Sequence, residues 1–186
     1  TAYAVGWEST FLDAGQVHAL LSTLFTPALF LLPLDGFSVA DVQALRFVQE
    51  YFLVACALAD LVRRFQRSNA DWSTLPEKVA IQLNDTHPTL AVPELMRILL
   101  DDAHLGWDQA WDLTQRTLAY TNHTLLPEAL EKWPLAWFEL LLPRHLEIIL
   151  EINRRLLDAV RERFPGEAGR VEPISLIDEG AERKIR

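Results

Sequence analysis

The sequence has 186 residues, half of them hydrophobic and 23% charged, which is typical of a folded globular chain rather than a disordered one. The formal net charge of -9 argues against a surface for nucleic acid or an anionic membrane, because both require excess Lys and Arg. The single cysteine, Cys56, excludes an internal disulfide and favours a reducing compartment. The longest apolar run, residues 24–34, is too short to span a membrane. We therefore expect a soluble, cytoplasmic protein with a sizeable core.

The N-terminal part of the chain predicts two helices of unequal clarity. Glycines and prolines interrupt the first forty residues, where only residues 14–25 suggest a helix. From Val39 to Arg67, apolar residues recur at steps of three and four, which predicts a long amphipathic helix. A polar loop is predicted over residues 67–78.

The remaining patterns alternate between strand and helix. In chain order they predict a buried strand over 78–84, a helix over 89–100, a helix over 107–117, a strand over 118–122, a turn leading into a helix over 123–133, and a long helix from Pro143 to Pro165. This order favours an α/β fold over a helical bundle. The chain starts at Thr1 and ends in a mixed-charge run, so we expect it to be a segment of a longer protein.

A cluster of polar residues follows each predicted strand. Residues 84–87 read Asn-Asp-Thr-His, and residues 120–124 read Tyr-Thr-Asn-His-Thr. Ligands of α/β sheets bind beyond the carboxyl ends of the strands, so the clusters face one crevice if the strands are parallel neighbours. Carboxylate, amide, hydroxyl and imidazole groups suit sugar hydroxyls, and neither cluster contains a strong cation for phosphate. The residues alone predict a polar ligand crevice.

Structural roles are the alternative for the same residues. Asp85 or Thr86 would then cap the following helix, and a lone histidine after a strand is commonly a hydrogen-bonded structural group. His87 and His123 together lack the Cys or Glu-x-x-His spacing that supports zinc, so no metal site is predicted. A dinucleotide site is disfavoured, because no G-x-G-x-x-G follows either strand.

Two long strings resemble one known family. Residues 78–101 (KVAIQLNDTHPTLAVPELMRILLD) and 119–134 (AYTNHTLLPEALEKWP) closely resemble the α-glucan phosphorylases of glycogen, starch and maltodextrin. The likeness continues through residues 141–157 (LLPRHLEIILEINRRLL) to 174–186 (ISLIDEGAERKIR), and covers Leu45 to Arg186 in one colinear run.

The resemblance implies a fold and an activity. The family has two Rossmann-like lobes in the GT-B arrangement, so this helix-rich α/β chain would be a fragment of the N-terminal lobe over residues 41–186. Residues 1–40 would be a diverged gate or connecting region. The full enzyme would transfer a terminal glucosyl unit from α-1,4-glucan to orthophosphate, giving glucose 1-phosphate, and would form a homodimer. Its pyridoxal phosphate would belong to the lobe that is absent here, so the fragment alone is expected to be inactive.

The resemblance also assigns site residues. Asp85 and His123 would be the catalytic residues, with His123 contacting the transferred glucose largely through its main-chain carbonyl. Glu128 would lie near the side channel of the pocket. The substrate-binding set would be Asn84, Asp85, His87, Asn122, His123, Thr124 and Glu131.

The chain departs from the family pattern in two places. None of the three lysines, Lys78, Lys132 and Lys184, stands in the context of the cofactor lysine. The gate motif, usually close to Tyr-Pro-Asn-Asp, is replaced over residues 24–43 by an apolar sequence. That change leaves a non-catalytic, glucan-binding phosphorylase as the alternative function. Arg63 and Arg64 match a pair that helps to bind AMP in animal enzymes, with a solvated helix face as the alternative.

Overall fold

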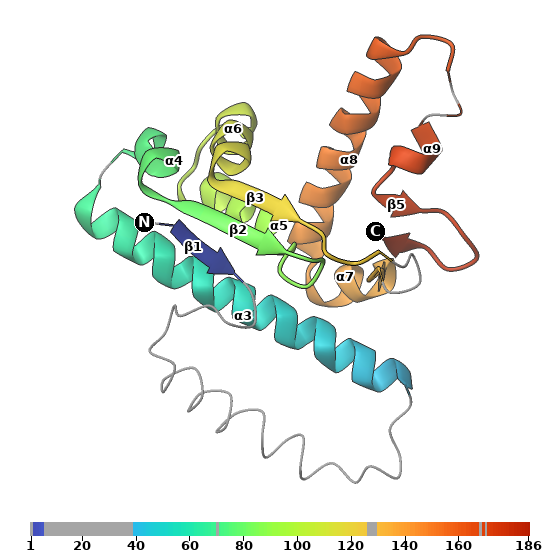
Figure 1. Cartoon of the computed structure of the whole chain (residues 1–186), viewed down its shortest axis with the longest axis horizontal. Coiled ribbons are helices and arrows are strands. Elements are labelled where there is room, and N and C mark those ends of the chain that lie inside the picture. Colours follow the sequence, from blue (N-terminus) through green and yellow to red (C-terminus); the bar gives the residue numbers. More distant parts are fainter. Residues whose placement is uncertain (1, 6–38, 70, 126–129, 168, 170) are drawn as a thin grey trace, which may run out of the picture. The chain divides into compact units, whose positions relative to one another are not determined.

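The computed structural model (Figure 1) describes residues 2–5, 39–69, 71–125, 130–167, 169 and 171–186. The chain forms two compact units, one of residues 1–92 and 111–123 and the other of residues 93–110 and 124–186. The predicted helix over 14–25 and nearly all of the gate segment lie outside the described residues. The division predicted at residue 40 therefore stays a prediction.

A three-stranded parallel sheet lies at the centre of the first unit. Its strands are β1 (Ala2–Val5), β2 (Ala80–Asn84) and β3 (Leu118–Thr121), in the order β1-β2-β3. The two predicted strands are confirmed, and they are parallel neighbours. Along β2, Ile81 and Leu83 are each 1% exposed whereas the alternate residues are half-buried or exposed, so one face of this strand carries the core.

Helix α3 (Val39–Ser68) confirms the long predicted helix and lies alongside the sheet in Figure 1. Its buried stripe follows the helical period and consists of Phe47, Val54, Leu58, Leu61, Val62 and Phe65. Fully burying one such side chain contributes about 1.5–3 kcal/mol. The helix ends where both the backbone N–H and the side-chain amide of Asn69 donate to the carbonyl of Phe65.

The predicted loop over 67–78 contains two short helices. The Asp71 carboxylate accepts from the Ser73 N–H at 2.9 Å and so caps η2 (Trp72–Thr74). Helix α4 (Leu75–Lys78) follows directly, with a proline in its first turn. A cap and an early proline are start signals that a loop assignment based on polarity overlooks.

The connection from β2 to β3 is helical, as predicted. Helix α5 (Ala91–Arg97) continues into a π-helical turn, η3 (Ile98–Asp102), and α6 (Trp107–Thr117) matches the predicted residues. Pro93 lies in the first turn of α5, where a missing N–H costs no hydrogen bond. Strand, helix, helix and strand in this order give a helix-rich α/β fold around a small parallel sheet.

The second unit contains α7 (Leu135–Leu141), α8 (Pro143–Arg163), α9 (Val171–Ile174) and a small antiparallel sheet. The strands of that sheet are β4 (Trp133–Pro134), β5 (Ile177–Asp178) and β6 (Lys184–Ile185), in the order β4-β6-β5. The long helix predicted from Pro143 is confirmed as α8. Among the described residues, no helix is both long and apolar enough to cross a membrane.

The helix predicted within residues 123–133 is wrong for the part that the structure describes. Residues 123–125 and 130–132 are not helical, and the chain then enters β4, where Trp133 pairs with Ile185. This partner is remote in sequence, so a local pattern gave no sign of the strand. Residues 126–129, which include Glu128, lie outside the described residues.

Candidate functional site

The carboxyl ends of β2 and β3 are joined by hydrogen bonds. Asn84 and Thr121 are register partners, and the backbone N–H of Asp85 donates to the Thr121 carbonyl at 2.8 Å. The Asp85 carboxylate in turn accepts from the backbone N–H of His123 at 2.7 Å. The two polar clusters therefore meet at one edge of the sheet, as parallel neighbouring strands require.

Asp85 reaches the neighbouring loop because its backbone turns sharply. Its φ is 61°, in the left-handed region that Asp and Asn enter more readily than most residues. Its carboxylate bonds across the strands to His123, which is a different partner from the helix N-terminus that the capping alternative requires. A bond to a charged acceptor is worth about 1.5–3 kcal/mol, which offsets the cost of the left-handed turn.

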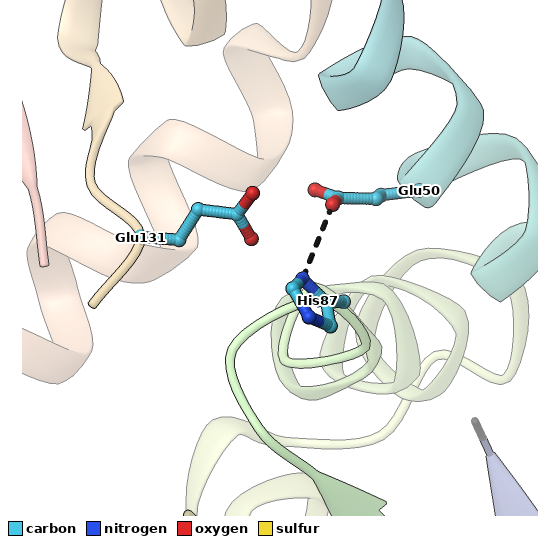
Figure 2. Close-up of side chains that lie close together, drawn as sticks. All are labelled: Glu50, His87 and Glu131. Atoms are coloured by element: carbon cyan, nitrogen blue, oxygen red, sulfur yellow. Dashed lines mark ion pairs between the residues drawn. The ribbon is translucent and has the colours of Figure 1, made fainter. Parts of the chain in front are cut away.

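His87 contacts charged residues of α3. Arg46 Nη2 lies 2.9 Å from His87 Nδ1, and Arg46 Nε donates to Glu50 Oε1 at 2.9 Å. A guanidinium only donates, so Nδ1 of His87 is the acceptor in this contact. Figure 2 shows the Glu50 carboxylate and the His87 ring facing each other, with Oε1 and Nδ1 3.5 Å apart.

Arg46 and Glu50 were missed by the sequence reasoning, although one signal was present. Glu50 is only 5% exposed and lies between Phe47 and Val54 at steps of three and four, within the apolar stripe of α3. A carboxylate in a buried stripe requires a partner. That observation would have pointed to this segment, though not to His87 as its neighbour.

The other predicted residues divide between the two units. Asn122 is exposed, and its amide donates to the Tyr120 hydroxyl at 2.9 Å. His123 is also exposed. Thr124 and Glu131 are half-buried and belong to the second unit. Within the first unit, the structure joins Asp85 to His123 at the strand ends that also carry Asn84 and Asn122. His87, two residues after Asp85, contacts Arg46.

The second unit holds another pair of acid and histidine that the sequence reasoning left without a role. His145 Nε2 lies 2.6 Å from Glu94 Oε2, and each residue is 3% exposed. Arg97 Nη2 also donates to Glu94, at 3.0 Å. Burial alone raises the pKa of Glu94, but the hydrogen bonds from His145 and Arg97 outweigh it and lower that pKa below the ordinary value of 4.5. This pair joins α5 to α8 and is closed to solvent.

Comparison with known proteins places the chain in a family. The carbohydrate phosphorylase family model matches residues 28–186. The chain is 53% identical over 163 residues to the muscle form of glycogen phosphorylase from Homo sapiens, covering 83% of this chain and 19% of that protein. It is also 53% identical over 163 residues to the brain form from Bos taurus, with the same coverage. The muscle form from Rattus norvegicus is 54% identical over 151 residues, which are 77% of this chain and 18% of that protein.

These matches fix the family, although the chain spans only about a fifth of the length of the relatives. The family match includes the strand ends that carry Asp85 and His123, and it extends over both compact units. The chain therefore belongs to the carbohydrate phosphorylase family.

Proposed function

We propose that the full-length protein is a glycogen phosphorylase, a glycosyltransferase that moves a terminal glucosyl unit from α-1,4-glucan to orthophosphate. The product is glucose 1-phosphate. The observation that carries this proposal is the 53% identity to proteins named glycogen phosphorylase. The single cysteine favours a reducing compartment, and the proposal places the enzyme in the cytoplasm.

In this proposal the carboxyl edge of the parallel sheet forms one wall of the glucosyl pocket. The lobe would be the N-terminal lobe of a GT-B enzyme, and Asp85 and His123 would act at that edge. The bond between the Asp85 carboxylate and the His123 N–H supports this role, because it fixes the main chain of the loop while the His123 side chain stays exposed. Asn84, His87, Asn122, Thr124 and Glu131 complete the proposed substrate-binding set.

The chemistry asked of this segment is positioning and electrostatic complementarity. In the proposed reaction the bond from the anomeric carbon to the glucan oxygen breaks, a bond to a phosphate oxygen forms, and the glucan oxygen takes up a proton. A sugar ring held rigidly as charge develops on the anomeric carbon lowers the barrier, since the orientation cost is already met on binding. The carboxylate, amide and imidazole groups at the strand ends can hydrogen-bond the hydroxyls of such a ring.

The proposal assigns pyridoxal phosphate to the lobe outside this chain. A lysine that forms a Schiff base needs a desolvated amine. Lys78 is exposed, Lys132 is paired with Asp178 at 2.9 Å, and Lys184 with Glu182 at 3.1 Å. The lysines of this chain therefore do not fit a Schiff base with the cofactor. A second copy of the enzyme is the proposed protein partner.

The test is expression of the complete open reading frame, followed by an assay with maltodextrin, orthophosphate and added pyridoxal phosphate. We expect release of glucose 1-phosphate that depends on phosphate. Glucan binding without release would overturn the proposal in favour of a non-catalytic protein. Asp112→Asn is a matched control for variants of Asp85, because Asp112 is an exposed, ion-paired aspartate on α6. Its activity should equal that of the wild type.

A further inference from the structure

We propose that Gln82 is a positioning residue, which acts through the Thr121 hydroxyl to fix the loop that carries His123. This inference rests on the proposed function, because it assigns that loop a part in the same reaction. Gln82 lies outside both polar clusters, and Thr121, although it belongs to the second cluster, was assigned no role of its own.

The Gln82 amide contacts both strand ends. Its Nε2 donates to Thr121 Oγ1 at 3.0 Å and lies 3.4 Å from Asn84 Oδ1. It also lies 3.1 Å from the Leu83 carbonyl. A primary amide has two N–H groups, so these three acceptors share them.

The register of the sheet explains how the amide reaches that edge. Gln82 is opposite Ala119, whose side chain ends at Cβ, while Thr121 is the diagonal neighbour two residues further along β3. The long glutamine side chain therefore lies over the alanine and extends toward the carboxyl ends of the strands. Side chains alternate along a strand, so Gln82 and Asn84 lie on the face opposite to the buried Ile81.

Three hydrogen bonds then hold residues 121–123. The Thr121 carbonyl accepts from Asp85, the Thr121 hydroxyl accepts from Gln82, and the His123 N–H donates to the Asp85 carboxylate. A hydroxyl has one proton, so a hydroxyl that accepts from Gln82 keeps that proton for another acceptor. Gln82 thereby sets both the rotamer of Thr121 and the direction in which its hydroxyl donates.

The experiment uses the full-length enzyme and a double-mutant cycle. Gln82→Met keeps the length of the side chain but removes the donors, and Thr121→Val keeps the branched shape but removes the hydroxyl. We expect each variant to lower kcat about three- to tenfold with little change in KM for glucan, the size of one hydrogen bond felt in the transition state. The double variant should lose no more than either single variant, because both remove the same bond.

Thr121→Ser separates positioning from a structural role. Serine keeps the hydroxyl but is a poorer strand residue than valine. If the hydroxyl positions the loop, Thr121→Ser retains activity within about twofold and Thr121→Val does not. If Thr121 only supports the strand, Thr121→Val should retain more activity than Thr121→Ser. Gln115→Met, at an exposed glutamine of α6, is the matched control and should leave kcat unchanged.

Several results would overturn the inference. If the losses in kcat of the two single variants multiply in the double variant, the two side chains act independently and the inference is wrong. Full activity of Gln82→Met would also contradict it. A drop in thermal midpoint with unchanged kcat and KM for the folded fraction would assign Gln82 to stability alone. If the wild-type enzyme itself releases no glucose 1-phosphate, the proposed function fails instead, which keeps the two failures distinct.

Discussion

The two units each contain an acid paired with a histidine, and the two pairs use different atoms. In the first unit, the Asp85 carboxylate accepts from the main-chain N–H of His123, and the histidine side chain lies at an exposed edge. In the second unit, the Glu94 carboxylate binds the imidazole of His145, and both side chains are buried. One arrangement fixes a loop at an exposed edge of the sheet, whereas the other joins two helices. The residue types alone do not distinguish the two cases, but burial and the bonded atom do.

The buried Glu94–His145 pair should contribute more to the free energy of unfolding than the bond between Asp85 and His123. Removing one partner of a buried ionic network leaves the other partners without compensation, which typically costs about 3–5 kcal/mol. Glu94→Ala leaves both His145 and Arg97 without this carboxylate. We therefore expect a marked fall in the thermal midpoint of the full-length enzyme, measured by scanning calorimetry.

Glu147→Ala is the matched control for that experiment. Glu147 lies on α8 and pairs with Arg144, but 66% of its side chain is exposed. Exposed ion pairs contribute about 0–1 kcal/mol, so the thermal midpoint should scarcely change. Equal destabilisation by the two alanine variants would contradict the distinction between a buried and an exposed pair.

The contribution of the Glu94–His145 pair to the stability of the protein should also depend on pH. Because the pKa of Glu94 is lower in the folded protein than its ordinary value of 4.5, the unfolded state binds the proton more tightly. Stability from this group is thus fully present above the unfolded pKa, and it is lost as the pH falls through the folded pKa. The stability difference between wild type and Glu94→Gln should be constant near pH 7 and shrink below about pH 4.5. Denaturant titrations at both pH values measure it, and a difference that grew with acid would contradict this sign.

The bond between Asp85 and His123 should affect turnover more than folding. Asp85→Asn keeps an oxygen that accepts from His123 and a residue that tolerates positive φ, but it removes the charge. Charged acceptors bind about 1 kcal/mol more strongly than neutral ones, so we expect about a fivefold fall in kcat. Phosphorolysis kinetics and a thermal melt of the same sample check this prediction. An early melt with normal kcat would assign Asp85 to structure.

The fold was predictable where local patterns decide it. The helices α3 and α8 have long apolar stripes, and β2 and β3 have short apolar runs followed by polar clusters. The strands β4, β5 and β6 were missed because they are only two residues long and depend on partners remote in sequence. The strand β1 was missed because its four residues lie in the stretch that glycines and prolines interrupt. No pattern of period two develops over so few residues.

The site was predictable in part for the same reason. Asp85 and His123 follow strands that were recognised, so the rule for the carboxyl ends of parallel strands brought them together. The roles of Arg46, Glu50 and Gln82 depend on side-chain rotamers and on how α3 packs in the first unit, which one sequence does not specify. The positive φ of Asp85 also escaped prediction, because aspartate is common in ordinary turns.

That positive φ gives the smallest effect that we predict. Asp85→Ala and Asp85→Gly both remove the carboxylate, so they lose the same bond to His123 and should have similarly low kcat. They differ in the backbone, because a φ of 61° is strained for alanine and accessible to glycine. The left-handed conformation costs an ordinary residue about 1–2 kcal/mol, and this should make the alanine variant less stable despite the greater entropy of unfolded glycine. Denaturant midpoints of the two full-length variants measure the difference. If alanine were the more stable of the two, the turn at Asp85 would relax once its carboxylate is gone, and the bond to His123, rather than the local backbone, would be what holds it.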